Sequence, residues 1–272
     1  MPPAAGIVST SVLAFLALLS CRSEPREIVL TSTTSTEDSG LFEVLLPAFQ
    51  SAHPQYRVRV IAVGSGEALR LAARGDADVV LSHSPRAEME FINAGYGESR
   101  DRVMFNDFVV VGPVSPAGRT CDDRDVIVVL RCIAESESLF ISRGDDSGTH
   151  ARERELWAAA GLRPEGEWYL EVGQGMGAVL MMASEKEAVT LSDRGTYLSR
   201  SDRLQLRVVS EGDPRLRNQY SVIVVRGASN PDGAHAFVEW IVSMSAQKII
   251  GKYGVEKYGR PLFSPNARPP GM

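Results

Sequence analysis

Residues 56–85, YRVRVIAVGSGEALRLAARGDADVVLSHSP, contain the pattern that decides the fold. An alternating apolar run predicts a β-strand at 56–62, and the turn GSG at 64–66 then opens a helix that continues to Arg74. A second apolar run at 77–81 predicts a buried strand, and the Ser-Pro pair at 84–85 is typical of a helix start. Strand, helix and strand in this order indicate an α/β fold with a parallel sheet covered by helices.

The rest of the chain repeats this alternation. On the N-terminal side, a short strand at 28–30 precedes a helix around 41–49, in which Pro47 predicts a kink or an early end. On the C-terminal side, we expect strands at 108–111, 139–142, 188–191 and 220–225, and helices at 147–160, 175–184 and over most of 231–258.

Two α/β lobes joined by two crossover strands explain this layout better than one continuous sheet. We expect lobe I to comprise residues 27–111 plus 219–268 and lobe II to comprise residues 112–218. Ligands of open α/β sheets bind at the carboxyl ends of the strands, so we expect a ligand in the cleft between the lobes.

The composition of the 272-residue chain narrows the class of protein. Hydrophobic residues make up 44% and charged residues 23%, which is typical of a soluble globular protein and excludes a collagen-like fibre or a polytopic membrane protein. The 29 Lys and Arg residues are outnumbered by 34 Asp and Glu residues, giving a net charge of −5. A general nucleic-acid binder is more often basic, so we expect no nucleic-acid partner.

The N-terminus has the features of an export signal. The stretch 12–19 is an apolar run, VLAFLALL, and no charged residue precedes Arg22. A run of this length suits a signal peptide, whereas a membrane span needs about 20 apolar residues. We therefore expect residues 1–20 to be a signal peptide. The sequence LLSC at 18–21 resembles a bacterial lipobox, which implies a lipidated Cys21 and a membrane-anchored lipoprotein; the alternative is an ordinary secretory signal.

Export to an oxidising compartment would permit a disulfide between Cys121 and Cys132. Apolar residues recur at helical spacing between 122 and 135. Two cysteines three turns apart on one helix lie too far apart to bond, whereas a Cys121 in the preceding loop could reach its partner. The sequence leaves both outcomes open.

Four expected helix starts share a design of small, hydroxylated and glycine residues. A helix N-terminus offers unpaired backbone N–H groups and about half a positive charge, hydroxyl groups add donors, and glycine permits close approach. One such loop is explained by ordinary capping, but four from two lobes indicate a shared site for a small oxyanion. The loops are TTSTEDSG at 33–40, GSG at 64–66, DDSGT at 145–149 and GQGMG at 173–177.

Arg143 follows an expected strand and precedes an expected helix, so it would project at the carboxyl edge of the sheet. Its guanidinium offers donors in a fixed geometry that suits a tetrahedral oxyanion. The alternative is a surface ion pair with Asp145 or Asp146.

These motifs closely resemble those of the tungstate-binding proteins of Tup-type ABC importers. The resemblance spans about residues 27–260 and is most specific in SRGDDSGTH at 142–150, with support from DADV at 76–79 and NDFV at 106–109. It implies a type II periplasmic-binding-protein fold that closes over tungstate and delivers it to a membrane permease with its ATPase. It also implies a monomer outside the cytoplasm, with no cofactor and no metal besides the tungsten of the ligand. The resemblance and the loop design together predict contacts to the anion from Thr34, Ser35, Ser65, Arg143, Ser147, Thr149, Met176 and Gly177.

Parts of the sequence also fit three other functions, those of an aspartic protease, a phosphate receptor and a molybdate receptor. The motifs DSG at 38–40 and DSGT at 146–149 match the signature of aspartic proteases, but such enzymes are all-β and their aspartates follow apolar residues, so we expect no enzyme. Phosphate keeps a proton that a carboxylate must accept, and Asp38 or Asp146 could serve. Molybdate is nearly the size of tungstate. Only the resemblance favours tungstate over these two anions.

Overall fold

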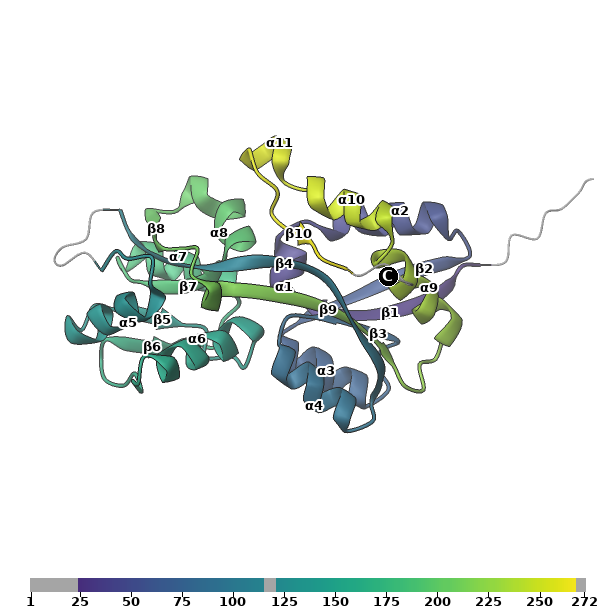
Figure 1. The fold of residues 1–272 in the computed structure, drawn as a ribbon, viewed down its shortest axis with the longest axis horizontal. Coiled ribbons are helices and arrows are strands. Elements are labelled where there is room, and N and C mark those ends of the chain that lie inside the picture. Colours follow the sequence, from purple (N-terminus) through teal and green to yellow (C-terminus); the bar gives the residue numbers. More distant parts are fainter. Residues whose placement is uncertain (1–23, 115–120, 268–272) are drawn as a thin grey trace, which may run out of the picture.

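The computed structural model describes residues 24–114 and 121–267, and Figure 1 shows an elongated molecule with helices around a central pair of long strands. The expected signal peptide, residues 1–20, and the expected lipidation site, Cys21, lie outside the described residues. No helix within the described ranges is long and apolar enough to cross a bilayer.

One group of elements, which we call lobe I, is built on a sheet with the strand order β10-β4-β9-β3-β1-β2. β1 pairs in parallel with β2 and β3, as the βαβ pattern predicts, whereas β9 is antiparallel to both β3 and β4. The strands are β1 (Arg26–Thr33), β2 (Tyr56–Val63), β3 (Val79–Ser82), the first part of β4 (Gly97–Pro113), β9 (Arg217–Val225) and β10 (Ser264–Pro265).

Helices cover both faces of the lobe I sheet, so the central strand β3 buries side chains on both sides. Along β3, Val79 and Leu81 belong to the cluster under α2, α9 and α10, while Val80 belongs to the cluster under α3 and α4. The helices are α1 (Thr34–Asp38), α2 (Phe42–Ala52), α3 (Ser65–Ala73), α4 (Pro85–Asn93), α9 (Pro231–Ile241), α10 (Met244–Lys252) and α11 (Val255–Tyr258).

The second group, lobe II, is built around the end of β4, which pairs with β7 and β8. A parallel pair, β5 and β6, lies beside β7 through a bridge between Phe140 and Val189. Its strands are β5 (Phe140–Ser142), β6 (Tyr169–Glu171), β7 (Thr190–Asp193) and β8 (Leu206–Ser210), and its helices are α5 (Val126–Glu135), α6 (Gly148–Ala159), α7 (Met176–Glu185), α8 (Arg194–Arg200) and the 3₁₀ turns η1 (Ser201–Arg203) and η2 (Pro214–Leu216).

β4 and β9 connect the two lobes, as Figure 1 shows. β4 pairs with β9 from Gly97 to Asp107 and with β7 from Phe108 onward, so one continuous strand serves both sheets. The expected α/β class with two crossover strands is confirmed. The strand expected at 108–111 is part of a longer strand, β4, which begins at Gly97. The sequence does not reveal this beginning, because residues 98–102 are polar and not buried.

Two local expectations are settled by the structure. Of the kink or early end expected at Pro47, the early end is wrong, since α2 continues to Ala52. Pro47 removes one backbone donor, and the carbonyl of Glu43 that would have accepted this bond belongs to an exposed residue that water can reach. The cysteine question is also decided: Cys121 precedes α5, which begins at Val126, and it forms a disulfide with Cys132 across a Cα–Cα distance of 5.6 Å.

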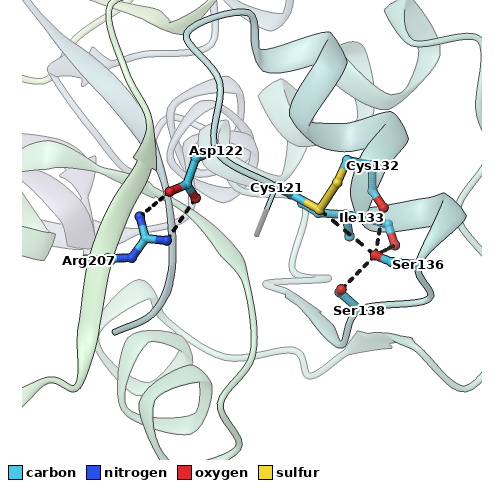
Figure 2. Close-up of a disulfide and its surroundings, with 7 residues drawn as sticks. All are labelled: Cys121, Asp122, Cys132, Ile133, Ser136, Ser138 and Arg207. Carbon is cyan, nitrogen blue, oxygen red and sulfur yellow. Dashed lines mark hydrogen bonds and ion pairs between the residues drawn. A yellow bond between two sulfur atoms is a disulfide. The ribbon is translucent and has the colours of Figure 1, made fainter. Parts of the chain in front are cut away.

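The disulfide lies beside an ion pair that fixes the same loop, as Figure 2 shows. Asp122 accepts a hydrogen bond from Nη2 of Arg207 on β8 at 3.0 Å, and its other oxygen lies 2.7 Å from Nη1 of the same residue. The segment that leads into α5 is therefore attached both to its own helix and to the lobe II sheet.

Candidate functional site

The loops at the starts of α3 and α6 lie against each other where the two lobes meet. A Cβ placed on Gly64 would be 3.6 Å from the Cα of Ser147, and one on Gly66 would be 3.3 Å from the carbonyl oxygen of Asp146. A Cβ on Gly148 would lie 3.0 Å from the Oγ of Ser65. The structure thus brings together two of the four polar loops, one from each lobe, and their glycines permit this close approach.

Three buried hydroxyl groups of the polar loops at 33–40, 64–66 and 145–149 have no hydrogen-bond partner. The side chains of Ser35, Ser65 and Thr149 are at most 1% exposed, and the hydroxyl oxygen of each lacks a protein partner. An unsatisfied buried polar group costs about 1–3 kcal/mol, so such groups are rare without a reason. Three of them at the predicted positions indicate donors held ready for a ligand.

Arg143 lies directly after β5 and is buried, with 3% of its surface exposed. Its Nε donates to Oδ2 of Asp145 at 3.1 Å, and its Nη2 donates to the same oxygen. The other oxygen of Asp145 accepts from the backbone N–H of Ser147 at 3.2 Å. The alternative, an ion pair at the surface, is wrong because Arg143 is buried. Its expected partner Asp145 is confirmed, and this carboxylate holds the buried guanidinium in one orientation.

The backbone around Arg143 is fixed by contacts that need glycine. Gly144 has a φ of +59°, and a Cβ there would lie 2.7 Å from the Cβ of Glu171. The carbonyl oxygen of Arg143 accepts from the N–H of Gln174 at 3.3 Å, which joins this loop to the loop that precedes α7. A third polar loop is thereby held beside the first two.

The remaining predicted residues contribute in different ways. Ser147 caps α6, since its Oγ accepts from the N–H of His150 at 3.2 Å, and Thr34 is the half-buried first residue of α1. The side chain of Met176 is fully buried in the lobe II core, so only its backbone N–H can serve a ligand. Gly177 is buried beneath the guanidinium of Arg200, a residue that the sequence analysis did not select.

His83 lies at the contact between the lobes and is neutral at pH 7. Burial lowers the pKa of His83 to about 4. A hydrogen bond to Asn218 opposes this decrease, and the positive charge of Arg143 adds to it. Its Nδ1 lies 2.9 Å from Oδ1 of Asn218, and its ring stacks on Tyr220. A Cβ on Gly148 would be 2.7 Å from Cε1 of His83, so His83 forms part of the surface that α6 meets. The sequence analysis did not select it as a site residue.

Asp193, also missed, caps α8 and is only 1% exposed. Its Oδ2 accepts from the N–H of Thr196 at 2.8 Å. Burial raises the pKa of the Asp193 carboxyl. The positive charge of Arg143 opposes this rise and the negative charge of Asp38 adds to it, because both residues lie near Asp193. The sequence SDRGT at 192–196 follows a strand with a capping Asp, a Gly and a Thr, a pattern that could have identified this fifth loop.

The described parts of the chain contain no cluster of three or more His, Cys, Asp or Glu side chains that could hold a metal ion. The site is instead rich in hydrogen-bond donors. These are hydroxyl groups, guanidinium groups and the free backbone N–H groups at the starts of α3, α6 and α7. Such a set binds a small anion that has several oxygens.

Comparison with known proteins agrees with this chemistry. Residues 21–245 match the family model described as a PBP superfamily domain. The chain is 49% identical to a protein from Peptoclostridium acidaminophilum named tungstate-binding protein TupA, over 88% of this chain and 86% of that protein.

Two solved structures are also similar. A tungstate ABC transporter structure from Geobacter sulfurreducens is 42% identical, with a TM-score of 0.76 over 84% of this chain and 98% of that one. The tungstate-binding protein TupA from Desulfovibrio alaskensis G20 is 38% identical, with a TM-score of 0.74 over 89% of this chain and all of the other.

Proposed function

Since this chain belongs to the PBP superfamily and, within it, to the family of its TupA relatives, we propose that it captures tungstate between its two lobes and delivers the anion to an ABC transporter permease. The members of this family are binding proteins, so this chain is not an enzyme, and the aspartic-protease alternative is set aside.

The single observation that carries the proposal is the set of buried hydroxyls of Ser35, Ser65 and Thr149, contributed by both lobes and left without partners. Tungstate is a fully deprotonated dianion, so it needs donors only. Arg143 adds charge, and the first N–H groups of α6 and α7 add further donors. The proposed contacts are Thr34, Ser35, Ser65, Arg143, Ser147 and Thr149 with the backbone of Met176 and Gly177.

Phosphate needs a carboxylate that accepts its proton. The side chain of Asp146 is 74% exposed, and Asp38 faces Arg200 at 3.5 Å. Asp193 has a buried Oδ1 without a partner, so phosphate is kept as an alternative ligand. Molybdate has the same charge and shape as tungstate and remains the other alternative ligand of the same site.

The location and the partners follow from the same proposal. The proposed division is lobe I at residues 27–111 plus 219–268 and lobe II at residues 112–218, with the anion between them. The pairing of Phe108 to Val111 with β7 places these four residues of β4 in the lobe II sheet. Residues 1–20 direct export, and the lipid on Cys21 anchors the mature protein to a membrane outside the cytoplasm. There it works as a monomer with a permease and its ATPase, and with no nucleic acid.

Calorimetry of the mature protein with tungstate, molybdate, phosphate and sulfate tests the function. We expect one tungstate bound per chain, with phosphate and sulfate much weaker. Tighter binding of phosphate than of tungstate would identify a phosphate receptor. Mass spectrometry of the protein from its native membrane tests the anchor separately: an acylated Cys21 is expected, and a soluble chain cleaved elsewhere would remove the anchor without affecting the ligand.

A further inference from the structure

Arg200, the last residue of α8, places its guanidinium on the first turn of α7. A Cβ on Gly177 would lie 2.6 Å from Nη2, 2.7 Å from Cζ and 2.8 Å from Nε of Arg200. The start of the ten-residue α7 carries about half a positive charge. Two positive groups are therefore in contact, an arrangement that repels unless a negative group joins them.

The protein supplies little negative charge of its own here. Nη2 of Arg200 lies 3.5 Å from Oδ1 of Asp38, and the two side chains are 36% and 32% exposed. Such a long, partly exposed ion pair contributes little to stability and neutralises the guanidinium only weakly. The Nε of Arg200 is buried and has no hydrogen-bond partner. One donor of this guanidinium thus stays unused beside the start of α7.

Arg200 also borders a cavity of about 760 Å³ that lies between the lobes. Asp38, Ser39 and Gly40 line it from lobe I, and Arg200 and Arg203 line it from lobe II. The guanidinium therefore contacts this cavity on one side and Gly177 on the other.

We propose that Arg200 is a second guanidinium ligand of the captured dianion, donating from Nε at the start of α7. This inference rests on the proposed function. Two arginines, Arg143 and Arg200, then match the two negative charges of the ligand. Gly177 is required because any side chain there would displace the guanidinium. Asp38 faces Arg200 from the opposite lobe at 3.5 Å, so the ligand and not this weak ion pair has to supply the compensating negative charge.

The variant Arg200→Gln tests the proposal, with Arg203→Gln as the matched control. Arg203 lies three residues further along, its side chain is 78% exposed, and its acidic neighbour Asp202 is 4.0 Å away. Both changes remove one positive charge at the same cavity. By calorimetry with tungstate, we expect Arg200→Gln to weaken binding at least about tenfold and Arg203→Gln to change it less than about twofold. Arg200→Lys should recover only part of the loss, because it lacks the planar fork.

A double-mutant cycle with Gly177→Ala separates a ligand contact from a structural effect. We expect Gly177→Ala to weaken tungstate binding in the wild-type background and to add little in the Arg200→Gln background. If Arg200→Gln binds tungstate like the wild type, or if the two effects add fully, Arg200 is no ligand and the proposed function stands unchanged. If the wild type prefers phosphate, the proposed function fails, and the same variants titrated with phosphate decide the role of Arg200.

Discussion

The two faces of the site differ in charge. Lobe I contributes the neutral hydroxyls of Ser35 and Ser65, and burial keeps the nearby His83 neutral. Lobe II contributes Arg143 and the starts of two longer helices, and we assign Arg200 to the same face. We therefore expect lobe II to supply most of the attraction for a dianion and lobe I to add hydrogen bonds.

Buried glutamates away from the site show the opposite difference. In lobe I, Glu88 is fully buried and accepts from Nε of Arg100 at 2.7 Å, from the hydroxyl of Ser82 and from the N–H of Ser84. In lobe II, Glu153 is 2% exposed and accepts from the hydroxyl of Tyr169 at 2.7 Å, a neutral partner. Burial raises the pKa of Glu153 to about 7. Burial raises the pKa of Glu88 as well, but the charge of Arg100 and the donors Ser82 and Ser84 oppose this rise. Lobe II instead holds a carboxyl that is protonated below neutral pH.

The largest expected effect concerns Glu153. Its folded pKa lies above the unfolded value of 4.5, so its contribution to stability is full below pH 4.5 and is lost as pH rises to about 7. At 1.36 kcal/mol per pH unit, the loss is about 3 kcal/mol. We expect Glu153→Gln to match the wild type in urea unfolding at pH 4.5 and to exceed it by about this amount at pH 8.

The control for this prediction is Glu155→Gln on the same helix. The side chain of Glu155 is 52% exposed and pairs with Arg152 at 2.9 Å, so its removal should change stability little at either pH. An equal difference between Glu153→Gln and the wild type at pH 4.5 and pH 8 would show that the carboxyl of Glu153 does not titrate in this range.

The next largest effect is on affinity and concerns the charge of lobe II. We expect Arg143→Ala to weaken tungstate binding by about 1.5–3 kcal/mol, or about ten- to a hundredfold, the usual contribution of a hydrogen bond to a charged group. Arg143→Lys retains the charge but loses the planar fork, so it should recover part of the affinity. Competition titrations measure both. Affinity of Arg143→Ala equal to the wild type would leave Arg143 as a brace for Asp145 only.

The smallest effect concerns a neutral donor of lobe I. Ser65→Ala should weaken tungstate binding by about 0.5–1.5 kcal/mol, because it removes one hydrogen bond. It should leave the unliganded protein as stable or more stable, because the lost hydroxyl has no partner there. Calorimetry and thermal unfolding without ligand measure the two quantities.

Ser32 provides the contrast to Ser65. It is equally buried, but its hydroxyl donates to the carbonyl oxygen of Leu81 at 3.0 Å. Ser32→Ala should therefore lower stability and leave affinity unchanged. If Ser65→Ala behaved like Ser32→Ala, the hydroxyl of Ser65 would be structural, and the lobe I face of the site would need a different donor.

Local sequence patterns carried much of the fold. The alternating run at 56–62, the turn at 64–66 and the Ser-Pro pair at 84–85 correspond to β2, α3 and α4 because each depends on neighbouring residues only. The beginning of β4 was missed because its residues before Val103 are mostly polar and partly exposed, and their strand conformation depends on pairing with β9.

The same distinction explains which residues of the candidate site were found. Loops such as 145–149 carry their polar residues together and are visible in the sequence. Arg200 stands alone at the end of a helix, and only the packing of α8 against α7 and α1 gives it a neighbour in Gly177 and in Asp38. His83 depends on Asn218, 135 residues further along the chain. Such pairings over long sequence distances leave no local signal.

The position of β9 also determines the order in which the molecule can fold during its synthesis. β9 pairs with β3 and β4 in lobe I, but the ribosome makes it only after all the strands of lobe II. Lobe II can therefore fold while β1, β2 and β3 still wait for their last neighbours and for the helices α9 and α10. Strand pairing between distant parts of a chain is slow. The lobe whose sequence begins first is consequently the last to be completed.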